Sequence, residues 1–106
     1  MRKLVFLTGT KAELDEFSVT ARTAAGRQLR LVQFGHEPAD WKPMTTVGLG
    51  VAEIRIWDET GAYRVLYVAK FKDAVYVLHC FKKKSQKTEQ RNIDIAAARY
   101  RSIPRK

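Results

Sequence analysis

The sequence predicts an α+β domain in which an antiparallel sheet packs against helices, with elements in the order β-α-α-β-β-β-α. Three strand-like segments follow one another between residues 51 and 81, and their connections are so short that they must be hairpins. Two segments with apolar residues at helical spacing precede these strands, and a third follows them. Because 45% of the 106 residues are hydrophobic, residues 1–106 are expected to form a single domain with its own core.

The N-terminal third is expected to hold one strand and two helices. Residues 3–8 are rich in Val, Leu and Phe, which is typical of a strand. Thr10 is expected to cap a short helix that follows it. Ser18 is expected to cap a second helix that ends near Phe34, with its arginines turned outward and Gly35 as its C-terminal glycine.

The middle of the chain is expected to be a loop followed by three strands. Residues 36–43 are predicted to be a loop, since Pro38 and Pro43 interrupt regular structure. The predicted strands, which form an antiparallel meander, cover residues 51–57, 63–71 and 74–81. Cys80 lies in the last of them and is expected to be a small core residue, because a single cysteine cannot form an internal disulfide.

The last predicted element is an amphipathic helix over residues 89–101. Four apolar residues at helical spacing define its buried face, and they are Ile93, Ala96, Ala97 and Tyr100. The arginines of this helix are expected on its outer side. Residues 102–106 are expected to form a flexible basic tail.

Positive charge is concentrated towards the C-terminus. The chain has a net charge of +9, and residues 82–106 hold nine Lys or Arg against Glu89 and Asp94. Four lysines follow the last predicted strand within six residues, and they are Lys82, Lys83, Lys84 and Lys87. Because like charges this close repel one another, RNA, DNA or an acidic protein is the expected partner of this surface. The alternative is a solvated face that serves only solubility.

Other classes of protein and site have little support in the sequence. No run approaches the roughly 20 apolar residues of a membrane span, and the N-terminus lacks the apolar stretch of a signal peptide. No membrane partner is therefore expected, and the expected location is cytoplasmic. The two histidines, His36 and His79, lie far apart in the sequence, so neither a zinc site nor another cofactor is expected.

Several segments resemble the RelE/ParE superfamily of toxin–antitoxin toxins. They are Glu53-Ile54-Arg55, Tyr63-Arg64-Val65-Leu66-Tyr67 and the stretch from Val77 to Thr88 that contains the lysine run. Residues 33–38 and 40–44 are similar to the HigB-like, phage-derived branch, and the resemblance extends over about residues 4–100. It implies a RelE-like fold and a small toxin that enters the ribosome and cuts messenger RNA there. It also implies a cognate antitoxin, expected to be a helix-turn-helix protein encoded nearby.

The resemblance also implies roles for individual residues. Arg55 takes the place of a basic active-site residue, and Arg64 resembles an arginine that contacts phosphate. Lys83 matches a residue that stabilises charge or protonates the leaving group. Metal-free RNA cleavage by the 2′-hydroxyl needs such cations, together with an acid and a base. Flanking phosphates are expected to bind the remaining basic residues of this region, which are Lys82, Lys84, Lys87 and Arg91.

The general base is left open by the sequence, with Glu53 and His79 as candidates and Tyr100 as a third, although the helical spacing of Tyr100 predicts core packing first. Glu53 should share a sheet face with Arg55, two residues along the strand, and the ordinary pKa of a histidine suits His79 to proton transfer. Trp57 shares the same predicted face and is the best candidate to stack on a base. A purely structural alternative for Arg55 is a salt bridge with Asp58 or Glu59 on the adjoining turn. Arg64 is expected to be exposed, and His79 has the alternative of a hydrogen-bonded structural residue.

Two other functions compete with the nuclease. The first is the ParE mode within the same superfamily, in which a toxin inhibits DNA gyrase without nuclease chemistry. The second is a non-catalytic basic RNA-binding module. Converging cations at Arg55, Arg64 and Lys83 favour the nuclease, because a gyrase inhibitor does not need them.

Overall fold

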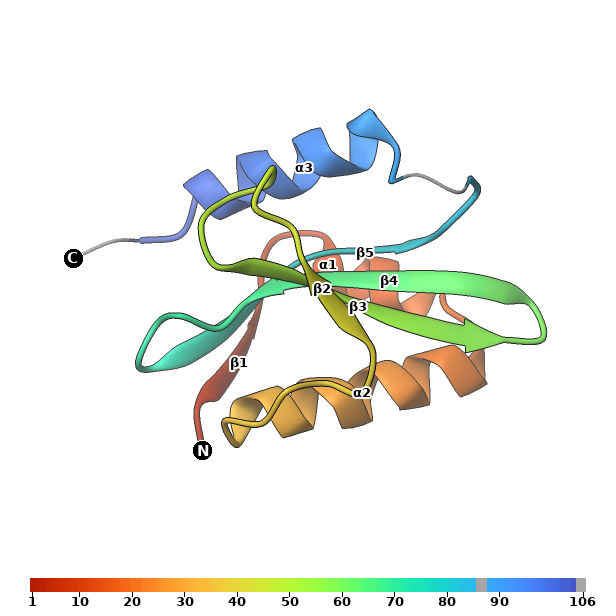
Figure 1. Ribbon diagram of the computed structural model, residues 1–106, viewed down its shortest axis with the longest axis horizontal. Coiled ribbons are helices and arrows are strands. Elements are labelled where there is room, and N and C mark those ends of the chain that lie inside the picture. Colours follow the sequence, from red (N-terminus) through yellow and green to blue (C-terminus); the bar gives the residue numbers. More distant parts are fainter. Residues whose placement is uncertain (86–87, 105–106) are drawn as a thin grey trace.

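The computed structural model describes residues 1–85 and 88–104. The strands are β1 (Lys3–Phe6), β2 (Trp41–Pro43), β3 (Val51–Asp58), β4 (Gly61–Val68) and β5 (Ala74–Lys82), and the helices are α1 (Thr10–Asp15), α2 (Val19–Gln33) and α3 (Gln90–Arg101). The strands form one sheet in the order β1-β5-β4-β3-β2, with α2 on one face and α3 on the other (Figure 1). The predicted α+β class is therefore confirmed. No helix in the described part of the chain has the length and apolar character that crossing a bilayer demands.

The predicted meander is present, although the sheet has two further features. Strands β3, β4 and β5 pair antiparallel in sequence order, as their short connections require. Strand β1 pairs with β5 in parallel, with Lys3 opposite Ala74, so the sheet is mixed at this edge. The prediction of a loop over residues 36–43 was wrong for its last three residues, because Trp41–Pro43 form β2 against β3. An edge strand of three residues tolerates a proline at its end.

The N-terminal cap is predicted correctly for α2 and incorrectly for α1. The Ser18 hydroxyl accepts a hydrogen bond from the Ala21 amide at 3.0 Å and caps α2 as predicted. Gly9, with φ +90°, occupies the cap position of α1 that was predicted for Thr10. Thr10 is instead the first residue of this helix, and its hydroxyl donates to the Leu7 carbonyl at 2.8 Å.

Replacing Ser18 with alanine is expected to lower the free energy of unfolding by about 1–2 kcal/mol. The upper part of this range applies because the hydroxyl also bonds the Asp58 carboxylate at the end of β3, so that it joins the helix to the sheet. Urea unfolding followed by circular dichroism measures the change. Thr20→Ala, an exposed position in the same helix, is the matched control. Equal midpoints for the two variants would contradict a capping role for Ser18.

Each face of the sheet carries its own core. On one face, Ala25 and Leu29 of α2 pack in a cluster with Ile54, Val65 and Val77. In the same cluster lies Cys80, which is 2% exposed as predicted for a core residue, and burial raises the pKa of its thiol to about 12. Apolar packing on both faces accounts for the stability of a domain this small.

The second core lies between the sheet and α3. Ala96 and Tyr100 of α3 pack with Leu66 and Leu78 of the sheet, which confirms the predicted buried face of this helix. Ile103 is 3% exposed and belongs to the same core. The predicted flexible tail is therefore wrong at Ile103, and its last two residues, 105 and 106, lie outside the described residues.

Candidate functional site

An open pocket of about 650 Å³ lies between the β3–β4 hairpin and residues 83–85, which follow β5. Its lining residues are Arg55, Trp57, Ala62, Arg64, Lys83, Lys84 and Ser85. Arg55 and Trp57 share a face of β3 because they are two residues apart, as predicted. Arg64 lies directly opposite Arg55 on β4. The sheet therefore brings together Arg55, Arg64 and Lys83, the three cations expected to converge.

Arg64 lies at the buried side of this pocket. Its side chain is 2% exposed, which contradicts the expectation of an exposed arginine. Its Nη1 donates to the Tyr63 carbonyl at 3.0 Å, and its Cζ lies 5.3 Å from the centre of the Trp57 ring. Burial lowers the pKa of the Arg64 guanidinium, the Glu53 carboxylate opposes this effect, and the Arg55 cation adds to it.

Glu53 lies beneath the pocket with no exposed surface. Its Oε1 is 3.5 Å from Arg64 Nε and 3.9 Å from Lys42 Nζ, while its Oε2 accepts a hydrogen bond from the Thr88 hydroxyl at 3.2 Å. Within the described residues, neither Oε1 nor Arg64 Nε has a hydrogen-bond partner. A carboxylate without solvent access cannot reach a hydroxyl in the pocket, so this geometry gives no support to Glu53 as the general base.

Arg55 is more open to solvent than Arg64. Its Nη1 is 3.7 Å from Asp40 Oδ1, in a pair whose side chains are 36% and 50% exposed. The acidic partner is therefore Asp40, and not the Asp58 or Glu59 considered from the sequence. Asp58 instead accepts hydrogen bonds from the amide and hydroxyl of Thr60. Because an exposed pair of this kind contributes little stability, Arg55 can exchange Asp40 for a phosphate.

Two lysines of the basic run complete the pocket. The Lys83 amide donates to the Ala62 carbonyl at 2.7 Å, which continues the pairing of β5 with β4 by one residue. Burial and the Arg64 cation both lower the pKa of the Lys83 ammonium. Lys84 is exposed and lines the same pocket.

Two of the other predicted phosphate-binding residues, Lys82 and Arg91, do not line the pocket. Lys82 is opposite Tyr63 on β4, and its Nζ lies 5.8 Å from the centre of the Tyr63 ring, towards the α2 side of the sheet. Arg91 is exposed on α3 and does not line the pocket. Lys87 lies outside the described residues. Of the four predicted flanking cations, Lys84 is therefore the one that the described structure places at the pocket.

His79 is 4% exposed and is held away from the pocket by two polar side chains. Its Nδ1 lies 3.0 Å from Glu13 Oε1, and its Nε2 lies 2.7 Å from Asn92 Oδ1. An extra residue in β5, Leu78, shifts the register so that His79 lies opposite Leu66, on the α3 side. This placement favours the structural alternative for His79 and gives no support to its role as a base.

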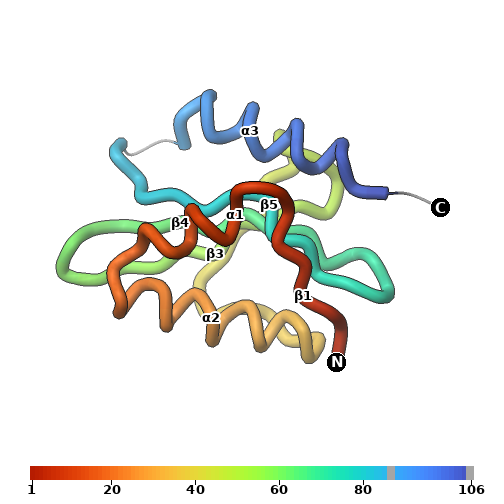
Figure 2. Tube along the Cα trace, turned by 180° about the vertical axis from the view of Figure 1, so that it is seen from behind, coloured from red at the N-terminus to blue at the C-terminus, as the bar shows by residue number. Residues whose placement is uncertain are grey.

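Glu13 connects three elements around His79. Seen from behind, α1 lies between α2 and α3 (Figure 2). Glu13 Oε1 accepts hydrogen bonds from the Cys80 amide at 3.1 Å and from Arg99 Nη1 at 2.8 Å. Arg99 therefore turns inward, contrary to the prediction that the α3 arginines face outward. Burial raises the pKa of Glu13, but hydrogen bonds from His79, Arg99 and the Cys80 amide outweigh it and lower that pKa to about 2.

Sequence reasoning missed two residues beside the pocket, Lys42 and Thr88. Lys42 lies opposite Glu53 in β2, a strand that the loop prediction had excluded. A sign of Lys42's role would have been its place in a short edge strand. The sequence hides this strand, because Pro43 at its end is typical of a loop. Thr88 has no signal in the sequence, because its partner Glu53 lies 35 residues away.

The chemistry of this pocket suits a phosphate with a neighbouring base. Two guanidinium groups and two ammonium groups can bind phosphate oxygens, and Trp57 is 66% exposed and available for stacking. Among residues 1–85 and 88–104, no three His, Cys, Asp or Glu side chains gather as they would around a metal ion.

Comparisons with known proteins agree with this architecture. The structure of a double mutant of the Escherichia coli toxin RelE in the free state is similar, with a TM-score of 0.65 and 16% sequence identity. The alignment covers 97% of this chain and 98% of that chain. No functionally curated protein matches the chain. The family model described as "Phage derived protein Gp49-like (DUF891)" matches residues 12–101. Because this match spans most of the chain, the protein belongs to the Gp49-like family of phage-derived proteins, a family of RelE/HigB-type toxins.

Proposed function

We propose that this protein is the toxin of a type II toxin–antitoxin system and that it cleaves messenger RNA on the ribosome. The observation that carries the proposal is the convergence of Arg55, Arg64 and Lys83 beside the exposed ring of Trp57. A plain basic surface would need no buried arginine at its centre. The RelE-like fold and the Gp49-like family support the same proposal.

The proposed reaction is metal-free attack of a 2′-hydroxyl on the adjacent phosphate. It forms a 2′,3′-cyclic phosphate and releases a 5′-hydroxyl. Arg55 and Arg64 bind the non-bridging oxygens and stabilise the charge that develops there. Lys83 gives a proton to the leaving oxygen, a role that its lowered pKa favours at neutral pH. Since Glu53 and His79 lie outside the pocket, the proton of the attacking 2′-hydroxyl passes to solvent water, and the site acts chiefly by charge stabilisation and acid catalysis.

The partners follow from this proposal. The protein acts in the cytoplasm, where the ribosome presents its messenger RNA as a single strand. A cognate antitoxin, expected to be a helix-turn-helix protein encoded nearby, covers the basic surface and keeps the toxin inactive. Trp57 stacks on a base beside the cut, and Lys84 contacts a flanking phosphate.

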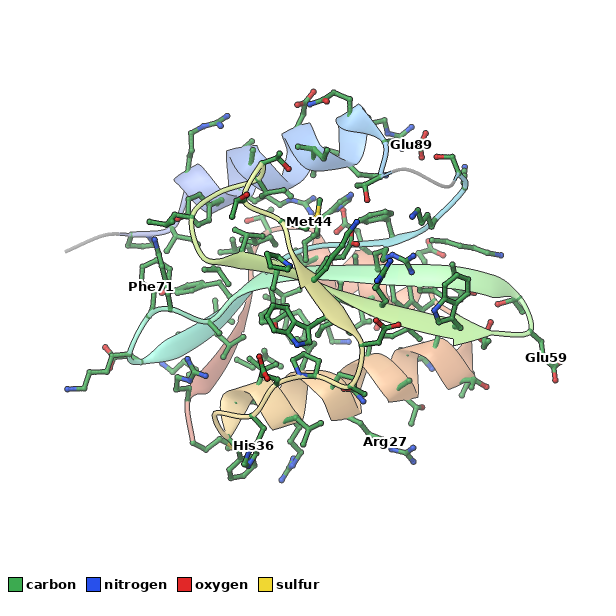
Figure 3. All side chains as sticks on the ribbon, viewed as in Figure 1. Arg27, His36, Met44, Glu59, Phe71 and Glu89 are labelled. Carbon is green, nitrogen blue, oxygen red and sulfur yellow. The ribbon has the colours of Figure 1, made fainter. Side chains whose placement is uncertain are left out.

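Lys83→Ala is expected to slow cleavage about 100-fold while changing ribosome binding less than about threefold. The reason is that Lys83 acts on the leaving group, whereas the remaining cations still hold the phosphates. Cleavage is measured by primer extension on a transcript translated in vitro, and binding by co-sedimentation with ribosomes. Arg27→Ala is the matched control, since Figure 3 shows Arg27 on α2, across the sheet from α3. Equal losses of cleavage and binding would make Lys83 an anchoring charge only.

Controlled expression in a bacterium separates the proposal from its two rivals. Growth arrest with new 5′ ends inside codons, absent in the Lys83→Ala variant, is the expected result. Arrest with DNA damage and intact transcripts would instead identify a ParE-like inhibitor of gyrase. Normal growth and intact transcripts, with the protein present in soluble form, would leave only a basic binding module.

A further inference from the structure

The chain that carries Lys83 and Lys84 is attached to the sheet at both ends. At its start, the Lys83 amide bonds the Ala62 carbonyl at 2.7 Å. At its end, the Thr88 hydroxyl bonds Glu53 Oε2 at 3.2 Å, and Thr88 is only 9% exposed. The second attachment lies just before α3, which begins at Gln90. Thr88 thus connects the residues that follow the lysine run to β3.

Glu53 is the buried anion around which the cations are arranged. Its Oε1 is within 3.9 Å of Lys42 Nζ and 3.5 Å of Arg64 Nε. Its charge also opposes the repulsion that Lys83 experiences from Arg64. One carboxylate thus offsets cations from three separate segments of the chain, and its other oxygen holds Thr88.

We infer that Glu53 and Thr88 are a positioning pair, which fixes the lysine-bearing chain and Arg64 in the geometry that cleavage requires. This inference rests on the proposed function and gives Glu53 a role other than that of a general base. Neither residue touches the RNA, because Glu53 is fully buried and Thr88 nearly so. Their effect is on where Lys83 and Arg64 lie, and small displacements of catalytic groups have large effects on rate.

The inference is tested by comparing Thr88→Val with Thr88→Ser. Valine keeps the shape of threonine and removes the hydroxyl, while serine keeps the hydroxyl. Thr88→Val is expected to lower kcat for ribosome-dependent cleavage about tenfold with KM within about twofold, and Thr88→Ser is expected to restore kcat. A purely structural role would instead reduce the amount of folded enzyme in proportion to the loss of stability. The kcat of the enzyme that remains folded would then be unchanged.

Amide hydrogen exchange provides a second readout that does not depend on activity. In Thr88→Val the Lys83 amide is expected to exchange about tenfold faster, because the far end of its chain is released. The Leu66 amide in the centre of β4 serves as the internal control and should be unchanged. In Thr88→Ser both amides should exchange as in the wild type.

The outcomes distinguish this inference from the proposed function. Unchanged kcat and unchanged Lys83 exchange in Thr88→Val would overturn the inference even if the wild type cleaves RNA. Faster Lys83 exchange with unchanged kcat would also overturn it, since the attachment would then not serve cleavage. If the wild type does not cleave RNA, the proposed function fails and the positioning role in catalysis fails with it. Exchange would then still decide separately whether Thr88 anchors the chain.

Discussion

Arg64→Ala is expected to reduce RNA cleavage by about 100- to 1000-fold and to lower the free energy of unfolding by about 3 kcal/mol. The first effect follows from the proposed function, in which Arg64 donates to the charge that develops on the phosphorane. The second follows because Glu53, fully buried, loses its closest cation, and its next ion-pair partner, Lys42, is 3.9 Å away. Single-turnover cleavage and urea unfolding of the purified variant measure the two effects separately.

A double variant separates catalysis from stability at this position. Combining Arg64→Met with Glu53→Leu removes the buried charge and its partner together, so most of the stability lost in Arg64→Ala is expected to return. Cleavage is expected to stay at or below the level of Arg64→Ala, because the double variant also loses the bond between Glu53 and Thr88. Recovery of cleavage in the double variant would show that Arg64 matters only for folding. A stable Arg64→Ala protein would show that Glu53 does not depend on this arginine.

The parts of the fold that the sequence predicts are those with a local signal. Ser18 caps α2 because a serine hydroxyl satisfies the first amides of a helix wherever the helix begins. Strands β3 to β5 form a meander because hairpin connections leave no other arrangement. Strand β2 has no such signal, since three residues ending in Pro43 acquire their conformation from pairing with β3.

In the candidate site, too, the residues placed by a local rule could be predicted, and those placed by distant residues could not. Arg55 and Trp57 could be assigned to one face because alternation along a strand is a local rule. The burial of Arg64 could not be predicted, since it depends on Glu53, which lies in another strand. For His79 the sequence left two readings open, because the side chains that hold it, Glu13 and Asn92, lie 66 and 13 residues away in the chain. The charge of Arg64 indicated an exposed side chain. Its pairing with the buried carboxylate of Glu53 instead places it in the interior.

The second large effect is expected at Glu13, far from the pocket. Glu13→Gln should lower the free energy of unfolding by about 3 kcal/mol at pH 7. The reason is that a charged acceptor shared by His79, Arg99 and the Cys80 amide becomes neutral. Urea unfolding measures the loss. Glu16→Gln, which neutralises an exposed carboxylate just after α1, is the matched control and should change stability by less than about 0.5 kcal/mol.

The pH dependence of stability gives this prediction its sharpest form. The pKa of Glu13 falls from 4.5 to about 2 on folding, so its ionised form stabilises the fold. That stabilisation, at most about 3 kcal/mol, is complete above pH 4.5 and is lost as the pH falls towards 2. The difference in stability between the wild type and Glu13→Gln should therefore shrink between pH 4.5 and 2. A difference that is independent of pH would mean that the Glu13 charge does not hold α1, β5 and α3 together, and that packing alone joins them.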